Sequence, residues 1–227
     1  MTRIAIAGAG RMGQAIAAGI ENQDDMELAG FWGRSDDLDQ VVSSADVVID
    51  FSLPDGTVRV LDAVLRRHKP LVCGVSGLSD AQMARLDEVA CEVPLVYDRN
   101  MSLGIAVLER SVRDAAASLG AGFEVSVSEV HHVHKKDAPS GTALKLGGAV
   151  AAARGEQGTG SVTFASERRG EVPGDHEVVM RSATETLAFA HSVTSRQVFA
   201  DGAICAARWI VGQKPGRYQM HDVLFEN

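Results

Sequence analysis

Residues 3–13 of the 227-residue chain read RIAIAGAGRMG, and they decide which fold the N-terminal part of the protein can adopt. The apolar run Arg3–Ala7 predicts a short strand. Met12–Ile20 predicts a helix, because apolar residues recur at every fourth position along it. Between these elements, Gly8–Gly13 form a complete GxGxxG motif. A strand, a glycine turn and a helix in this order are the context in which the motif binds a dinucleotide.

The glycines of this motif permit a tight turn and a close approach of the backbone to a pyrophosphate. The helix start that follows favours negative charge. The alternative is a glycine-rich turn that serves packing alone. We expect NADPH or NADH to bind here and no metal to be needed. The residues expected to contact the cofactor are Gly8, Ala9, Gly10, Arg11, Met12 and Gly13.

Strand and helix patterns alternate through the first hundred residues. Pro54–Gly56 indicates a turn, and Ser79–Gln82 matches the capping box of a helix start. Alternation of this kind predicts an α/β fold, a Rossmann-like doubly wound parallel sheet with ligands at the carboxyl ends of its strands. The further strands are expected at residues 28–32, 47–51, 70–75 and 94–97.

The pattern changes after Asn100. A long helix is expected from Ser102 and another over Ser140–Ala153. Apolar and polar residues alternate over 123–128, which predicts a strand in a sheet with one buried face. Other strands are expected at 161–166, 177–182 and 187–193, a last helix at 197–211, and mobile loops at 155–160 and 168–175.

Composition excludes several classes of protein. The net charge of −8 argues against a nucleic-acid binder, which usually carries a basic excess. Cys73, Cys91 and Cys205 are too widely spaced for a disulfide framework or a zinc ribbon, so we expect buried, reduced thiols. The N-terminal apolar run is too short for a signal peptide or a membrane span, which predicts a cytoplasmic protein.

The end of the second strand bears on cofactor preference. Sites that prefer NAD often place an acid there for the ribose hydroxyls, but this chain has Gly33 and Arg34. The guanidinium of Arg34 could pair with a 2′-phosphate, so we expect NADPH to be accepted at least as well as NADH. Asp36 and Asp37 could still reach a ribose, and Arg34 could instead be a solvated surface residue.

Residues 129–143 read EVHHVHKKDAPSGTA and hold the densest cluster of chemically active side chains. Histidine exchanges protons near neutral pH, lysine brings a compact positive charge, and a helix start favours anions. The cluster predicts a site that holds a carboxylate and protonates what is bound beside it. A metal site is disfavoured, because adjacent histidines on a strand point to opposite faces. A solvated strand end is the other alternative.

The chain resembles the 4-hydroxy-tetrahydrodipicolinate reductase (dihydrodipicolinate reductase) family of the diaminopimelate and lysine pathway. The resemblance covers nearly the whole chain, and the family's E-[AV]-H-H-x-x-K-x-D-x-P-S-G-T-A pattern is complete within 129–143. Further matches are the GxGxxG motif, Asp50–Ser52 with Pro54, Gly74–Gly77, Asn100 with Ser102, and Asp222–Leu224.

The resemblance implies roles for the matched positions. His131 would donate the proton, and Lys135 would be a second acid and a partner of a carboxylate. His132 and residues Ser140, Gly141 and Thr142 would hold the substrate's carboxylates. The residues that would line the nicotinamide and its ribose are Gly74, Val75, Ser76, Asp98, Arg99, Asn100 and Met101.

The resemblance also implies an architecture. Residues 1–100 with 196–227 would form the dinucleotide-binding domain. Residues 101–195 would form a smaller α+β domain with an open mixed sheet that binds the substrate and builds a homo-oligomer, a tetramer in the family. Hinges near Asn100 and Ser195–Arg196 would allow closure.

Some features depart from the family pattern. The chain is short, and after Gly174 it runs almost directly into a strand, where many members carry a further stretch of the sheet that bears on the tetramer contact. Val75–Ser76 replaces a commoner Thr-Thr, and Gly33 replaces an acid. The competing readings are another NAD(P)-dependent amino-acid oxidoreductase and a non-catalytic protein that senses dinucleotides.

Overall fold

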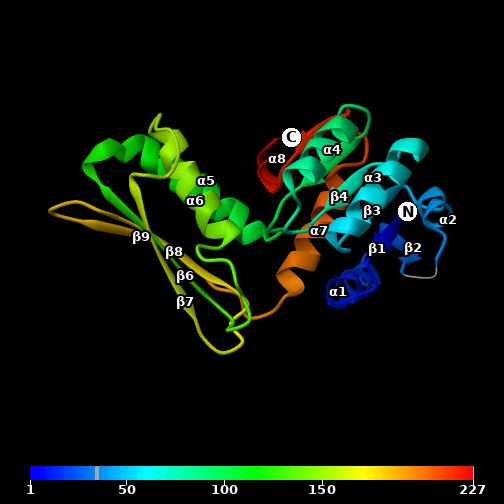
Figure 1. Cartoon of the computed structure of the whole chain (residues 1–227), viewed down its shortest axis with the longest axis horizontal. Coiled ribbons are helices and arrows are strands. Elements are labelled where there is room, and N and C mark those ends of the chain that lie inside the picture. The colour runs from blue at the N-terminus through cyan, green and yellow to red at the C-terminus, as the bar shows by residue number, and fades with distance from the viewer. Residues whose placement is uncertain (34–35, 227) are drawn as a thin grey trace. The chain divides into compact units, whose positions relative to one another are not determined.

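The computed structural model describes residues 1–33 and 36–226, and it divides into two compact units (Figure 1). The first unit comprises Met1–Leu103 and the chain from Gln197 onward. The second unit comprises Gly104–Arg196. Each unit has a sheet and a hydrophobic core of its own.

The first unit contains a six-stranded sheet with the order β10-β5-β4-β3-β1-β2. Every neighbouring pair is parallel, and helices lie on both sides of the sheet, as the alternating pattern predicts (Figure 1). Strand β10, which the sequence analysis did not predict, extends the sheet beside β5. The strands are β1 (Thr2–Ala7), β2 (Met26–Trp32), β3 (Val47–Asp50), β4 (Leu71–Cys73), β5 (Pro94–Tyr97) and β10 (Gly216–Tyr218).

One predicted turn of this unit is a helix start instead. Pro54 is the first residue of α3, where the missing N–H of proline costs nothing because the first N–H groups of a helix have no intrahelical partner. The capping box at Ser79 is confirmed, since its hydroxyl and the side chain of Gln82 exchange hydrogen bonds with each other's backbone. The helices are α1 (Arg11–Ile20), α2 (Leu38–Ser43), α3 (Pro54–Arg67), α4 (Asp80–Ala90), α7 (Gln197–Trp209) and α8 (Met220–Phe225).

The second unit contains a four-stranded mixed sheet with the order β7-β6-β8-β9. Strands β6 and β7 are parallel, and the other two pairs are antiparallel. Alternate residues such as Val125, Val127 and Val178 are buried against α5 and α6, which confirms a sheet with one buried face. The elements are α5 (Leu103–Leu119), η1 (Gly120–Gly122), β6 (Glu124–His131), α6 (Gly141–Ala153), β7 (Val162–Arg168), β8 (Asp175–Arg181) and β9 (Thr186–His191).

Two expectations are corrected. Arg168 belongs to β7 and not to a loop, because its side chain is held by neighbouring acceptors that the local sequence does not reveal. Cys91 is exposed at the end of α4, whereas Cys73 is buried and Cys205 is half-buried; all three are free thiols. Within the described ranges, each helix is too short or too polar to cross a lipid bilayer.

Candidate active site

The GxGxxG turn joins β1 to α1 at the carboxyl edge of the parallel sheet. Gly8 has φ +104°, and a Cβ on it would lie 2.7 Å from the carbonyl oxygen of Phe51 in the next strand connection. Only glycine fits this backbone. A Cβ on Gly10 would instead meet no atom within 4 Å, and no side chain caps the helix that follows it. The N–H groups of the first turn of α1 are therefore suited to bind an anion.

A cavity of about 620 Å³ opens at this turn. Its lining includes Gly8, Ala9 and Gly10 of the turn, and also Trp32, Gly33 and Arg59. The cavity and the open turn fit a dinucleotide, whose pyrophosphate needs close backbone approach and whose remaining length needs space.

The two acids that follow β2 accept hydrogen bonds from nearby backbone groups. The carboxylate of Asp36 accepts the backbone N–H of Gly33 at 2.7 Å, and Asp37 caps α2 by accepting from two backbone N–H groups. Both acids are thus engaged locally. The guanidinium of Arg59, on α3, lies over the ring of Trp32 at 4.9 Å from its centre. Arg34 lies outside the described residues.

The other predicted cofactor contacts follow β4 and β5 at the same edge of the sheet. Gly74 donates its N–H to the carbonyl of Asp50 at 3.0 Å, which continues the ladder between β3 and β4. Asp98 accepts from the backbone of Asn100 at 3.2 Å. Among the described residues that line the 620 Å³ cavity, none belongs to these two segments. The remaining predicted positions differ in exposure: Val75 and Met101 are buried, and Ser76 and Arg99 are exposed.

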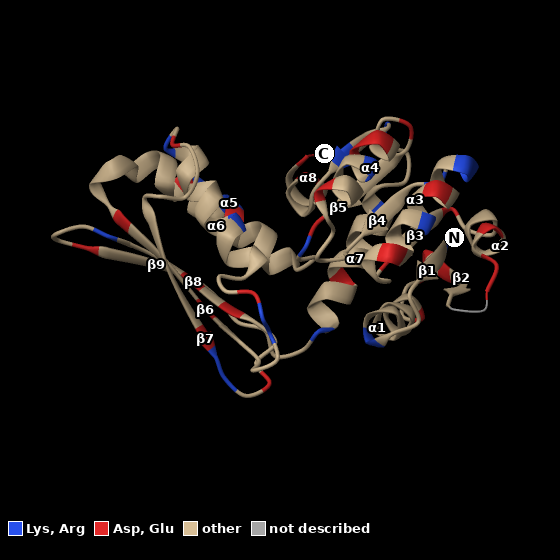
Figure 2. Ribbon diagram, in the orientation of Figure 1, with Lys and Arg blue, Asp and Glu red and all other residues tan. Residues whose placement is uncertain are grey.

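In the second unit, His131 ends β6 and is 7% exposed. Its Nδ1 hydrogen-bonds the carboxylate of Glu129, which is 2% exposed and lies two residues earlier on the same face of the strand. Arg168, opposite His131 in β7, forms a two-pronged ion pair with Glu129 at 3.0 and 3.1 Å. Figure 2 shows residues of both charge signs gathered at this end of β7.

Glu129, His131 and Arg168 influence one another's protonation. Burial alone would raise the pKa of Glu129, but hydrogen bonds from Arg168, Ser166 and His131 outweigh it and hold the pKa below its usual value. Glu129 is therefore a carboxylate, and Nδ1 of His131 must carry the proton of their hydrogen bond. Burial lowers the pKa of His131, although Glu129 acts in the opposite direction.

The loop after β6 brings Lys135 to the start of α6. The ammonium of Lys135 lies 2.9 Å from the carboxylate of Asp137, and the backbone N–H of Gly141 donates to the same carboxylate. Burial would raise the pKa of Asp137, but the hydrogen bond and charge of Lys135 lower it. A lysine and a helix start thus converge on one carboxylate, which is the arrangement expected of an anion site.

Ser140 is the N-cap of α6, where its hydroxyl accepts from the N–H of Ala143. The hydroxyl also lies 3.3 Å from Nε2 of His176, a 4% exposed residue of β8. Burial, aided by His131, lowers the pKa of His176 to about 4, so its ring is neutral at physiological pH. The rings of His176 and His131 meet edge to face, with their centres 5.1 Å apart.

The remaining predicted residues lie around this cluster. His132 is half-buried, with its ring centre 6.1 Å from that of the exposed His134. Gly141 and Thr142 form the first turn of α6 and are half-buried. In the ranges 1–33 and 36–226, no group of three or more His, Cys, Asp or Glu side chains is placed to hold a metal ion.

Sequence reasoning missed Arg59, Arg168 and His176. No local signal marks them, because each reaches its partner from a different strand or helix. Arg168 and His176 could have been found indirectly. If β7 and β8 are assumed to pair with β6, the register of those pairs brings both residues to the end of β6.

The first unit has a parallel sheet with a glycine turn and a cavity at its carboxyl edge. The second unit has a cluster of histidine, lysine and arginine side chains. Together these features define the class of protein, which is a dinucleotide-dependent oxidoreductase. The particular family follows from sequence comparison. The family described as "Dihydrodipicolinate reductase, N-terminus" matches residues 2–101, and "Dihydrodipicolinate reductase, C-terminus" matches residues 104–224. The chain belongs to the dihydrodipicolinate reductase family, and the predicted resemblance is confirmed.

Curated relatives agree. The 4-hydroxy-tetrahydrodipicolinate reductase of Zymomonas mobilis is 40% identical over 96% of this chain and 95% of its own length. That of Caulobacter vibrioides is 40% identical over 98% and 96%. The solved structure of a dipicolinate-bound dihydrodipicolinate reductase from Paenisporosarcina sp. TG-14 has a TM-score of 0.83 and 22% identity over 98% of this chain and 99% of that one, which confirms the fold. The family uses a nicotinamide dinucleotide and acts on a small dicarboxylate.

Proposed function

We propose that this protein reduces 4-hydroxy-tetrahydrodipicolinate, by way of its dehydrated form, to tetrahydrodipicolinate in diaminopimelate and lysine biosynthesis. The observation that carries the proposal is the cluster of Glu129, His131, Lys135 and the α6 start, in a chain of this family. The first unit binds the cofactor and the second binds the substrate. When bound, NADPH or NADH supplies a hydride to the conjugated imine of the substrate.

The proton that completes the reduction comes from His131. Hydride addition leaves an electron-rich enamine that must be protonated, and a positioned histidine is suited to this step. With Nδ1 engaged by Glu129, the proton to be given is the one on Nε2. Burial lowers the pKa of His131, and a bound dicarboxylate would raise it by adding negative charge. Substrate binding therefore favours the protonated donor.

The substrate's carboxylates bind to the cationic groups around α6. Lys135 and the N–H of Gly141 already converge on one carboxylate, that of Asp137, so they form one anion site. His132 and Thr142, adjacent to this site along the chain, serve the second carboxylate. Ser140 keeps the helix start in place by capping it.

The cofactor is held by the glycine turn at the start of α1, with NADPH accepted at least as well as NADH. Asp36 and Asp37 already accept hydrogen bonds from backbone N–H groups. Position 33 is a glycine, so it supplies no carboxylate for the ribose hydroxyls. Arg34 and Arg59 provide the cations for a 2′-phosphate; among the described residues Arg59 forms no ion pair. Gly74–Ser76 and Asp98–Met101, at the ends of β4 and β5, serve the nicotinamide half.

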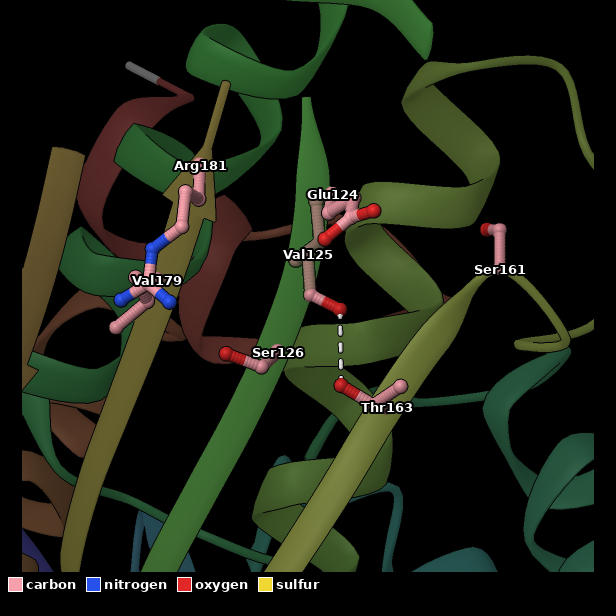
Figure 3. A pocket seen from close by; sticks show the side chains of 7 residues that line it. All are labelled: Glu124, Val125, Ser126, Ser161, Thr163, Val179 and Arg181. Atoms are coloured by element: carbon pink, nitrogen blue, oxygen red, sulfur yellow. Dashed lines mark hydrogen bonds between the residues drawn. The ribbon is translucent and has the colours of Figure 1, made fainter. Parts of the chain in front are cut away.

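The protein acts as a homo-oligomer. The face of the four-stranded sheet opposite α5 and α6 carries a hollow of about 480 Å³, and Figure 3 shows Ser126, Thr163 and Val179 on neighbouring strands around it. Glu124 and Arg181 are opposite each other in the register of β6 and β8, and both line the hollow. The same two opposite charges on a second copy would complement them. Light scattering of the purified protein would reveal a monomer if this is incorrect.

Oxidation of NADPH, followed by absorbance, tests the reaction with substrate made fresh from pyruvate and aspartate semialdehyde. His131→Ala and Lys135→Ala should each lower kcat by about 10²–10⁴-fold, the usual contribution of a general acid. Their affinity for NADPH should stay near that of the unchanged protein. Well-folded protein that binds NADPH without oxidising it would favour a dinucleotide sensor, and turnover of both variants at the unchanged rate would contradict the assigned roles.

A further inference from the structure

Arg168 lies among the groups assigned to substrate binding, yet its hydrogen bonds are already complete. A guanidinium has five N–H donors. Nε donates to the carbonyl of Lys135, and Nη1 and Nη2 each donate to one oxygen of Glu129. Nη1 also donates to the carbonyl of Glu167 at 2.7 Å, and Nη2 to that of Asp137. All five donors have acceptors within this unit, so none is left for a substrate carboxylate.

The acceptors are of two kinds. Glu129 and Glu167 belong to β6 and β7, whereas the carbonyls of Lys135 and Asp137 belong to the loop that leads to α6. The side chain of Arg168 is only 20% exposed. One planar group thus fastens the loop that carries Lys135 to the carboxylate that holds His131.

We propose that Arg168 is a positioning residue, which fixes the Glu129–His131 pair and the Lys135 loop in one geometry and does not bind substrate. The proposal rests on the function proposed above. A lysine would not replace Arg168, because a point charge on a flexible stem cannot satisfy this fork of acceptors. Small displacements of catalytic groups can cost about 10²-fold in rate.

Arg168 also sets the charge balance at His131. The charged and titratable groups that face this ring are Glu129 on β6, Arg168 on β7, His176 on β8 and Lys135 on the loop. Burial lowers the pKa of His131, and the positive charges of Lys135 and Arg168 act in the same direction. Removing the charge at position 168 should therefore raise the pKa of His131, and a lysine there should leave it nearly unchanged.

The test compares Arg168→Lys and Arg168→Met with Arg169→Met, a matched control. Arg169 is adjacent in sequence, but its side chain is 62% exposed and its partner Glu167 is 56% exposed. Both Arg168 variants should lose about tenfold to a hundredfold in kcat, with a smaller rise in substrate KM because the loop that carries Lys135 is loosened as well. A large rise in KM at unchanged kcat would make Arg168 a carboxylate ligand and overturn the proposal.

Two readouts without substrate separate this proposal from the proposed function. Amide exchange at Val133 and Lys135, whose N–H groups donate to the carbonyls of Gly170 and His132, should quicken in Arg168→Lys and not in Arg169→Met. The NMR titration of His131 should move to higher pH in Arg168→Met only. If both readouts match those of the Arg169→Met control, Arg168 has no positioning role. If they change while unmodified protein shows no turnover, the proposed reaction fails and the positioning role stands.

Discussion

The ammonium of Lys135 lies 2.9 Å from the carboxylate of Asp137, within the loop assigned to the substrate's carboxylates. The same carboxylate accepts the N–H of Gly141 at the start of α6. An internal acid therefore contacts the two groups that a substrate carboxylate needs. Substrate binding has to compete with Asp137.

Replacing Asp137 by Asn should strengthen binding of pyridine-2,6-dicarboxylate, because it removes the competing charge. The side chain of Asp137 is 56% exposed, so the pair contributes little, and a decrease of about two- to fivefold in Kd is expected. Titration calorimetry at low and high salt would measure it, with the difference shrinking as salt rises. Weaker binding by Asp137→Asn would mean that Asp137 orients Lys135.

Cofactor preference should depend on Arg34 and Arg59. Removing a charge-assisted contact to a phosphate typically costs about 1.5–3 kcal/mol, so Arg34→Ala or Arg59→Ala should lower kcat/KM for NADPH relative to NADH by about tenfold or more. Arg66→Ala is the control, since Arg66 is on the same helix and pairs with Asp39 at 2.9 Å. A ratio that stays the same in a variant removes that arginine from the cofactor site.

The stability of the protein should fall in mild acid because of His176. Its pKa is about 4 in the folded state against 6.5 for the free side chain, so below pH 6.5 the unfolded chain takes up a proton that the folded one does not. About 3 kcal/mol of the free energy of unfolding should be lost between pH 6.5 and pH 4. Urea unfolding across this range should show a shallower dependence for His176→Gln.

The control for that experiment is His134→Gln, since the side chain of His134 is 75% exposed. It should keep the pH dependence of the unchanged protein. If the free energy of unfolding of His176→Gln falls as steeply with pH as that of the unchanged protein, His176 is not the cause of the acid sensitivity.

Gly174 should be intolerant of any side chain. Its φ is +153°, and a Cβ on it would lie 2.9 Å from Nε2 of His131, the nitrogen assigned to proton transfer. Gly174→Ala should lower kcat by about tenfold to a hundredfold through displacement of that ring. Gly160→Ala is the control, because a Cβ there meets nothing within 4 Å. Kinetics of Gly174→Ala equal to those of the control would mean that His131 can shift freely.

The sequence alone determined the features that depend on short-range backbone geometry. The glycine turn at Gly8–Gly13, the capping box at Ser79 and the helix start at Ser140 are where they were predicted, because turns and helix starts depend on residues within four positions. The parallel sheet followed from the alternation of strand and helix patterns, and the one buried face of the second sheet followed from hydrophobic periodicity. That the second sheet is mixed was implied by the resemblance to the family. The HHxxK loop identified the family, since its residue types at that spacing are highly specific.

Tertiary structure decided what each active group contacts. Arg168 reaches Glu129 across 39 positions of sequence, and His176 reaches Ser140 across 36. These contacts depend on which strands pair and in what register, and register is set by burial of the whole sheet face, not by any local motif. Arg59, from a different helix, likewise reaches the cavity at the glycine turn only through the packing of α3 in the first unit. Local sequence therefore specified which reactive side chains are present near each turn and helix start. Long-range packing specified which charged and polar groups those side chains contact.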